Sequence, residues 1–179
     1  MHLAFMRAIN LGAHNPIKMS VLKELFASQG AHNVRTYLQS GNVLFQCAPQ
    51  EVSGVVRGVE AKLEELLGNA VPITTRPLAV MKQWIESEPY ASWEIRSDDK
   101  RYVTFLYHDP QHQLTFPLTS QRGDIVAFEL REREVLSVSR RVEGKYGFPN
   151  AFIEKELGVV ATSRRWSTVE KFIAKHGNI

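Results

Sequence analysis

The stretch that decides the fold is Val34-Arg35-Thr36-Tyr37-Leu38-Gln39-Ser40-Gly41-Asn42-Val43-Leu44-Phe45. Apolar and polar side chains alternate over residues 34–38, and residues 43–45 are apolar, as in strands that bury one or both faces. Ser40, Gly41 and Asn42 lie between these runs, and glycine next to asparagine is typical of a tight hairpin turn. The stretch therefore predicts an antiparallel β-hairpin.

The residues on either side of this hairpin extend it to a larger unit. Residues 3–9 are apolar and predict a buried strand, and residues 20–29 predict an amphipathic helix with Ser20 as its N-cap. After the hairpin, residues 51–67 predict a second helix and residues 71–75 a fourth strand. The element order β-α-β-β-α-β is the ferredoxin-like pattern. A further helix is expected to begin at Pro77 and run to about Ser87.

The same order returns in the second half of the chain. We expect strands over residues 102–107, 125–130, 135–138 and 160–164, helices over 150–157 and 167–175, and a weak helix or a loop with one turn over 111–118. Residues 73–85 align without a gap to residues 161–173, with identities at Thr74/Thr162, Arg76/Arg164 and Ile85/Ile173. We therefore predict an α+β fold of two ferredoxin-like βαββαβ subdomains related by internal duplication, each followed by a helix, over residues 1–88 and 102–179, with a connector at 89–101.

Composition excludes several classes of protein. The chain has 179 residues, and no apolar run approaches the roughly 20 residues that cross a bilayer. The N-terminal segment lacks the basic leader of a signal peptide, so we expect a cytoplasmic protein without a membrane partner. Cys47 is the only cysteine, which excludes an intrachain disulfide and a multi-thiolate zinc site. The formal net charge of +3 comes entirely from residues 121–179. This basic third of the chain is suited to bind an anion or nucleic acid, and the alternative is that its charges form a solvated face.

The hairpin string Arg35-Thr36-Tyr37, Gln39-Ser40-Gly41-Asn42-Val43 resembles the signature of the DUF1697 family, a set of mostly bacterial proteins of unknown function. Residues 6–12, residues 18–25 and residues 157–171 are similar to other conserved segments of that family. The resemblance implies the organisation described above and no agreed substrate, reaction or cofactor.

The sequence departs from the family pattern at three places. The family loop after the first strand commonly holds two glycines and a basic residue, where this chain has Gly12-Ala13-His14-Asn15. Arg165-Trp166-Ser167-Thr168 stands where the family has Asn-Trp-Asn-Thr, and a common Ser-Lys pair is replaced around Tyr146-Gly147. If these positions hold a ligand in relatives, the site is altered here.

One face of the first sheet gathers hydrogen-bonding side chains. Alternation places Arg35, Tyr37 and Gln39 on one face of their strand, and Arg7 and Asn10 follow the first strand. With Ser40 and Asn42 they are candidates to bind a small polar or anionic ligand, in which the arginines supply charge-assisted hydrogen bonds. In the alternative interpretation, Gln39, Ser40 and Asn42 shape the hairpin and the arginines pair with acids.

The strand-to-helix junction at residues 164–168 is a second candidate. Arg164, Arg165, Trp166 and Thr168 combine a guanidinium pair, an indole and a hydroxyl, which suits a phosphate or a stacked base. Arg140, Arg141 and Lys145 are expected nearby. The alternative is that Trp166 is a core residue and the arginines are solvated.

These features favour a binding protein over an enzyme, because no nucleophile, catalytic dyad, metal set or cofactor motif is readable. We expect a small anionic or polar ligand in the groove between the two subdomains. Single-stranded nucleic acid is an alternative, although the predicted third strand lacks the exposed aromatic residues of the common RNA-binding signature. An uncharacterised enzyme is the remaining alternative.

Overall fold

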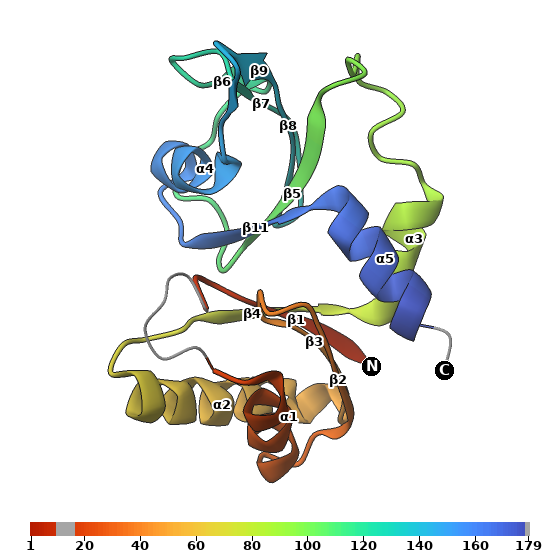
Figure 1. The fold of residues 1–179 in the computed structure, drawn as a ribbon, viewed down its shortest axis with the longest axis vertical. Helices are drawn as coiled ribbons and strands as arrows, with labels where there is room; N and C mark the ends of the chain where they lie inside the picture. The colour runs from red at the N-terminus through yellow and green to blue at the C-terminus, as the bar shows by residue number, and fades with distance from the viewer. Residues whose placement is uncertain (10–16, 178–179) are drawn as a thin grey trace. The chain divides into compact units, whose positions relative to one another are not determined.

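The computed structural model describes residues 1–9 and 17–177 and confirms a mixed α+β fold with antiparallel sheets (Figure 1). The chain divides into two compact units: unit 1 comprises Met1–Lys82 and Lys175–Ile179, and unit 2 comprises Gln83–Ala174. The expected subdomain boundaries, and a ligand groove between the halves, stay predictions. None of the described helices is long and apolar enough to cross a membrane.

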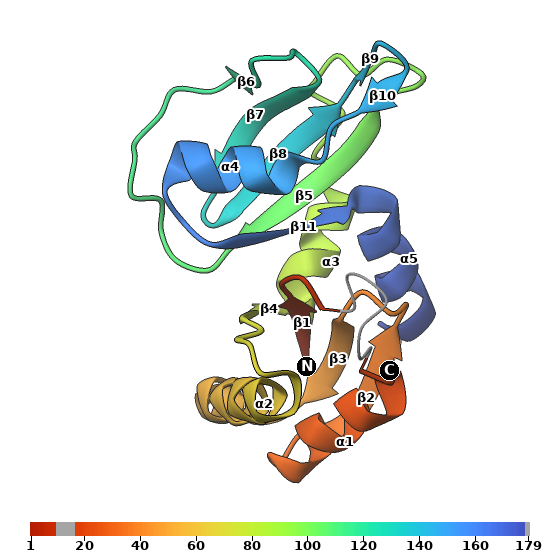
Figure 2. The same ribbon diagram turned by 60° about the vertical axis from the view of Figure 1, so that its left-hand side comes forward.

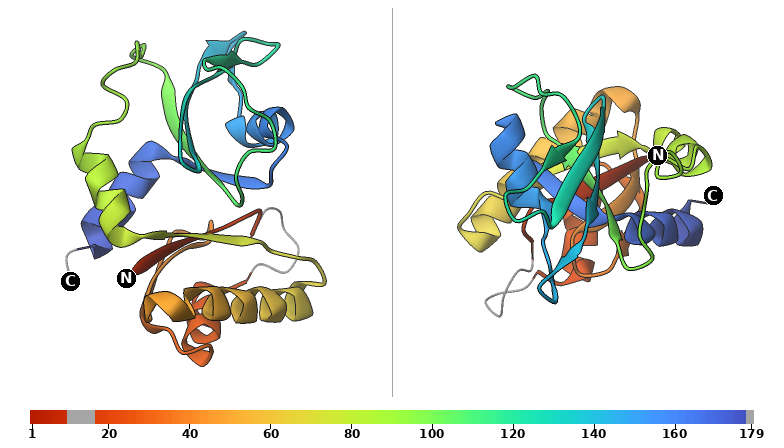
Figure 3. Two further views of the ribbon diagram at one scale, coloured as in Figure 1. Left: turned by 180° about the vertical axis from the view of Figure 1, so that it is seen from behind. Right: turned by 90° about the horizontal axis from the view of Figure 1, so that it is seen from above.

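Unit 1 is a four-stranded antiparallel sheet with strand order β2-β3-β1-β4. Its two long helices cover the same face of the sheet, as Figure 1 and the view from behind in Figure 3 show. Along the chain the elements are β1 (His2–Met6), α1 (Met19–Ser28), β2 (His32–Tyr37), β3 (Asn42–Gln46), a 3-10 turn η1 (Pro49–Glu51), α2 (Val52–Leu67), β4 (Ile73–Pro77) and α3 (Leu78–Glu86), which runs on into unit 2.

The core of unit 1 forms between this sheet and the two helices. Alternate residues of the central strands, such as Ala4 and Val43, are fully buried against Phe26 of α1 and Val59 of α2. The helices form because their apolar residues recur at helical spacing, so that burial of one stripe stabilises them. Helix α1 begins at Met19, one residue before the expected Ser20, and its N-cap residue Lys18 makes no side-chain cap hydrogen bond.

Unit 2 is a five-stranded antiparallel sheet with strand order β11-β5-β8-β7-β6, together with a separate two-stranded β9–β10 hairpin. Figure 2 shows one helix, α4, lying along one face of this sheet. The elements are β5 (Lys100–Leu106), β6 (Leu118–Thr119), β7 (Ile125–Arg131), β8 (Glu134–Ser139), β9 (Arg141–Val142), β10 (Lys145–Tyr146), α4 (Pro149–Leu157), β11 (Ala161–Arg165) and α5 (Trp166–His176).

The central strands of the two sheets pair in equivalent registers. In unit 1, Phe5 pairs with Thr74 and Asn42. In unit 2, Phe105 pairs with Thr162 and Glu134. Equivalent backbone hydrogen bonds also form at the ends of β1 and β5. The N–H groups of the last strand residues donate to carbonyls before the neighbouring strands, Met6 to Gly41 (3.0 Å) and Leu106 to Arg133 (2.8 Å). The next residues do the same on the other side, Arg7 to Pro72 (2.9 Å) and Tyr107 to Val160 (3.0 Å).

Each sheet also receives the same side-chain contact from the helix before its last strand. Glu60 of α2 accepts a hydrogen bond from the Ile73 backbone N–H at 2.7 Å, and Glu154 of α4 accepts one from Ala161 at 2.8 Å. Both helices end at a left-handed glycine, Gly68 or Gly158. Helix α4 is thus the counterpart of α2.

Unit 2 has no counterpart of α1. Residues 111–118, for which a weak helix or a loop was expected, contain no helix. Along the chain, the short strand β6 is the only element between β5 and β7. The segment follows Pro110, contains Pro117 and has no helical apolar stripe, so it lacks what stabilises an isolated helix. The element order β-α-β-β-α-β is therefore observed in unit 1, and the second half lacks the first helix.

Candidate functional site

The candidate residues of the first hairpin lie on the face of the sheet away from α1 and α2. Arg35 pairs with Leu44, and Tyr37 pairs with Asn42, so their side chains share one face with Thr74 and Arg76 across the sheet. Gln39 and Ser40 lie in the turn. The register therefore brings Arg35, Tyr37 and Asn42 together, as alternation predicts.

Asn42 has a defined structural partner in this hairpin. Its side chain is 1% exposed, and its amide nitrogen donates to the Tyr37 carbonyl at 3.0 Å and to the Ser40 hydroxyl at 2.9 Å. These bonds close the turn, where Gly41 has a φ of +71°. Asn42 thus shapes the hairpin, and its amide is already engaged.

The two remaining candidates of the first half are Arg7 and Asn10. Arg7 follows β1, is half-buried, and its backbone N–H donates to Pro72 at 2.9 Å. Asn10 lies outside the described residues, as do Ala13 and His14.

Arg164 is a buried structural side chain, and Arg76 is its counterpart in unit 1. The Arg164 guanidinium donates to the Thr162 hydroxyl (2.8 Å) and the Ser163 carbonyl (2.9 Å). Arg76 donates to the Thr74 hydroxyl (2.8 Å) and the Thr75 carbonyl (2.7 Å). Burial lowers the pKa of Arg164 to about 10, an effect that the nearby Tyr107 opposes.

Trp166 belongs to the core of unit 2. It is 2% exposed, and its ring centroid lies 5.5 Å from that of Tyr90. Helix α5 begins at Trp166, so the exposed Ser167 and the half-buried Thr168 lie in its first turn. Trp166 is therefore a core residue, and Thr168 belongs to the first turn of α5.

Arg165 is the exposed member of this junction, and it lies beside two aromatic rings. It pairs with Tyr102 of β5, so both side chains are on the α4 face of the sheet. Its guanidinium carbon is 5.8 Å from the Tyr102 ring centroid. The Phe148 ring lies 5.6 Å from Tyr102 at an interplanar angle of 83° and is 60% exposed. Phe148 and Arg165 thus both contact Tyr102.

Lys100 joins this group to the β9–β10 hairpin. Its ammonium nitrogen is 3.3 Å from the Tyr146 ring centroid, and Tyr146 pairs directly with Arg141. Burial lowers the pKa of Lys100 below its usual value, and the positive charges of Arg165 and Arg141 lower it further. We call these six residues the basic–aromatic patch: Lys100, Tyr102, Arg141, Tyr146, Phe148 and Arg165.

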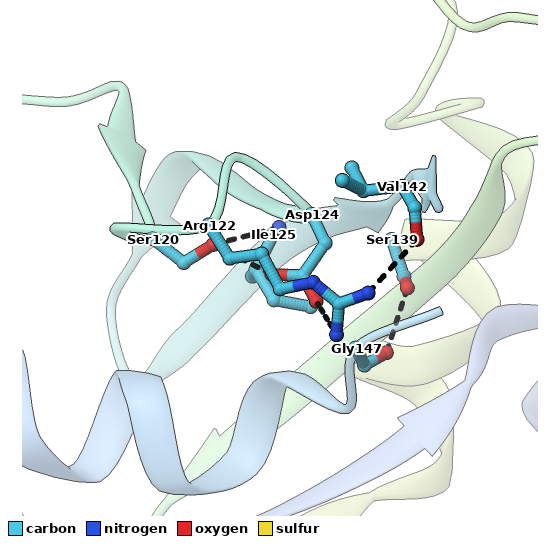
Figure 4. A network of polar contacts seen from close by, with 7 residues as sticks. All are labelled: Ser120, Arg122, Asp124, Ile125, Ser139, Val142 and Gly147. Atoms are coloured by element: carbon cyan, nitrogen blue, oxygen red, sulfur yellow. Dashed lines mark hydrogen bonds and ion pairs between the residues drawn. The ribbon is translucent and has the colours of Figure 1, made fainter. Parts of the chain in front are cut away.

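Polar contacts at the ends of β7 and β8 hold the β9–β10 hairpin in place (Figure 4). Asp124 accepts a hydrogen bond from Ser120 at 2.8 Å, and Arg122 lies 3.7 Å from its carboxylate while donating to the Val142 carbonyl at 2.8 Å. On the other arm of the hairpin, the Ser139 hydroxyl donates to the Gly147 carbonyl at 2.7 Å. These contacts fix the backbone on both sides of Arg141 and Tyr146.

Gly147 is needed at this position because the network leaves no room for a side chain. A Cβ atom there would lie 2.7 Å from both the Asp124 carboxylate and the Ile125 side chain. The hairpin can approach β7 only because residue 147 is glycine.

A buried polar ladder places the beginning of α4 next to the patch. Thr104 and Ser163 pair across β5 and β11 with their hydroxyl oxygens 2.7 Å apart, and Ser163 donates to Asn150 at 3.1 Å. Phe148 is the N-cap residue of α4 and makes no side-chain cap hydrogen bond. The positive end of the helix dipole therefore adds to the charge of the patch.

The cations of the patch have no acidic partner among the described residues. Over residues 1–9 and 17–177, no ion pair joins Lys100, Arg141 or Arg165 to a carboxylate. By contrast, Arg140 next to them lies 3.6 Å from the fully buried Asp99. Such a set can bind an anion through charge-assisted hydrogen bonds.

A metal centre and a hollow in unit 1 are the two other kinds of site. Among the described residues, no group of three or more His, Cys, Asp or Glu side chains lies close enough to hold a metal ion. A hollow of about 500 Å³ in unit 1 is lined by Gln29, Gly30, His32, Glu51, Gly54 and Val55. Glu51 there accepts a hydrogen bond from the Ala48 backbone at 3.1 Å, and the hollow has no lysine or arginine.

Sequence reasoning identified Arg165, with Arg141 and Lys145 nearby, but missed Lys100, Tyr102, Tyr146 and Phe148. Lys100 and Tyr102 were assigned to a connector and to a strand core. The missed signal was the alternation at the start of β5, which puts a cation and a ring on the face that also carries Arg165.

Comparisons with known proteins agree with this fold. The model of the family described as "Protein of unknown function (DUF1697)" matches residues 1–136. The solved structure of the conserved bacterial protein SP0830 from Streptococcus pneumoniae is similar in fold, with a TM-score of 0.59 and 16% identity over 95% of this chain and 94% of that one. Among curated proteins, none matches the chain.

Proposed function

The chain belongs to the DUF1697 family of proteins of unknown function, and we propose on that premise that it is a binding protein that holds a small anionic ligand at the basic–aromatic patch of unit 2. The observation that carries this proposal is that Lys100, Arg141 and Arg165 lie beside the Tyr146 and Tyr102 rings without a carboxylate partner in the described part of the chain. Like charges repel, so their proximity costs stability unless an anion joins them.

The chemistry of the patch favours a phosphate or a carboxylate. The planar guanidinium groups of Arg141 and Arg165 can each donate two parallel hydrogen bonds to such an anion. Lys100 adds a positive charge that its contact with the Tyr146 ring holds in place. Since the hairpin backbone is fixed by the Asp124 and Ser139 contacts, little ordering is left to oppose binding.

Calorimetric titration of the full chain with inorganic pyrophosphate tests the proposal. We expect saturable binding that weakens about tenfold in Arg165→Gln and in Arg141→Gln, since one charge-assisted hydrogen bond contributes about 1.4 kcal/mol or more. Arg57→Gln is the matched control, because Arg57 is exposed on α2 in unit 1. Binding that is absent, or equal in all three variants, would refute the proposal.

We also propose that the two sheets descend from one duplicated βαββαβ unit. The equivalent strand registers, the paired contacts of Glu60 and Glu154, and the matching bonds of Arg76 and Arg164 support it. In this proposal the second copy lacks its first helix and has gained the β9–β10 hairpin. A cytoplasmic location is retained as an expectation.

A further inference from the structure

We infer that the ligand of the basic–aromatic patch is a nucleoside phosphate, whose base stacks on Phe148 while its phosphate meets Arg165 and Arg141. This inference rests on the function proposed above and adds the chemical class of the ligand. Nucleoside phosphates combine an anion with a flat aromatic ring, and the patch presents a binding group for each.

Phe148 has the properties of a stacking surface. It is 60% exposed, more than the other large apolar side chains of the described residues, and it sits at a fixed point, the N-cap of α4. It meets Tyr102 edge to face, at 83°, and no other ring within residues 1–9 and 17–177 contacts it. A base could therefore cover this ring without displacing a side chain that already stacks on it.

The cations lie at a suitable place for the phosphate. Arg165 and Phe148 contact the same ring, that of Tyr102, at centroid distances of 5.8 Å and 5.6 Å. Only one ring thus separates the guanidinium from the stacking surface. An inorganic anion would satisfy the cations but would leave Phe148 exposed, and it would forgo the gain in binding free energy that comes from covering the apolar area of this ring.

The stacking residues are not those of the common RNA-binding sheet. That signature places its aromatic side chains on the central strands of the sheet. Here only Tyr102 lies on a central strand, on the face of β5 that α4 covers, and the other rings come from β10 and from the N-cap of α4. The absence of exposed aromatic residues on the third strand therefore does not count against a nucleotide at this patch.

The test compares ADP with inorganic pyrophosphate by calorimetric titration of the full-length chain. We expect ADP to bind about tenfold more tightly than pyrophosphate, which is in the range of base–aromatic stacking. Phe148→Leu should remove this preference. Phe148→Trp, which keeps a flat ring, should restore it. Because Phe148 is exposed, equal melting temperatures of the three proteins are expected and show that the fold is intact.

The outcomes separate the two proposals. If pyrophosphate binds and ADP binds no more tightly, or if Phe148→Leu keeps the preference, the nucleotide inference is wrong and the anion site stands. If neither probe binds, both proposals fail. A parallel titration with single-stranded oligothymidylate identifies the source of the nucleotide: an affinity above that of ADP, with a steep salt dependence, indicates a strand rather than a free nucleotide.

Discussion

The two sheets differ most at one set of equivalent positions. In unit 1, His2 pairs with Phe45 and Pro77, and Phe45 is fully buried with its ring 5.1 Å from Phe26 of α1. In unit 2 the equivalent residues are Tyr102, Ser137 and Arg165. The sheet register is the same, but Phe45, which is buried next to α1, is replaced by Ser137, and the positions paired with it carry Tyr102 and Arg165 instead of His2 and Pro77.

This difference explains why the candidate site is in unit 2. Helix α1 covers Phe45 in unit 1, whereas no helix lies between β5 and β7 to cover Ser137. The face that α1 would occupy is left to Phe148, Arg165 and the β9–β10 hairpin, which are exposed or half-buried. A binding surface can therefore arise on a ferredoxin-like sheet when one covering helix is missing.

Exchanging side chains at these equivalent positions should give the largest effects. Phe45→Ala is expected to lower the free energy of unfolding by about 3–5 kcal/mol, because it leaves a cavity under α1. Ser137→Ala is expected to raise it by about 1 kcal/mol, because the buried Ser137 hydroxyl has no hydrogen-bond partner in the part of the chain that the structure describes. Urea unfolding followed by circular dichroism measures both. A loss on Ser137→Ala would show that its hydroxyl is paired.

The hairpin turns offer the next comparison, since Gly41 and Arg133 accept equivalent backbone hydrogen bonds. A Cβ on Gly41 would lie 2.5 Å from the Ile9 side chain, and its φ of +71° disfavours other residues. Gly41→Ala should therefore cost about 2–4 kcal/mol of unfolding free energy. Arg133→Ala, at the exposed counterpart, should change it by about 1 kcal/mol or less. Equal losses in urea unfolding would contradict the assigned geometry.

Much of this fold was predictable from the sequence, because alternation and helical spacing act over a few residues. The hairpin of residues 34–45 and the order of unit 1 followed from such patterns. The β9–β10 hairpin was missed because each strand has only two residues and is held by the distant Arg122 and Asp124. The patch was only partly found, because the pairing of Tyr102 with Arg165 depends on sheet register between segments far apart in the chain.

The buried arginines should sharpen the comparison by responding alike. Arg76→Met and Arg164→Met each remove hydrogen bonds to a threonine hydroxyl and to a carbonyl, so each should lower the free energy of unfolding by about 2 kcal/mol. Chemical denaturation of the two variants and the wild type measures the difference. Losses that differ by more than about 1.5 kcal/mol would count against equivalent roles and against the duplication.

The smallest effect concerns pH. Burial, and then the charge of the chain's amino terminus, lower the pKa of His2, while Tyr102 occupies its place in unit 2. In the unfolded chain the pKa of His2 is about 6.5, so on acidification the unfolded chain binds the proton at a higher pH than the folded chain does. The free energy of unfolding therefore falls as the pH drops from about 6.5 towards the pKa of the folded state. The pKa of His176 is lowered too, by burial and then by Lys175, and it acts in the same direction. His2→Gln should reduce this pH dependence of the unfolding midpoint but not abolish it. An unchanged slope would show that His2 does not contribute.

The aromatic packing of unit 2 also determines how unfolding can be observed. The chain's three tryptophans are Trp84, Trp93 and Trp166, and all of them belong to unit 2. Trp93 stacks on Phe128 and Trp166 contacts Tyr90, so their emission will change when that packing is lost. Selectively excited tryptophan fluorescence therefore reports the unfolding of unit 2, whereas far-ultraviolet circular dichroism reports the helices of both units. The two signals will follow one curve only if the units unfold together.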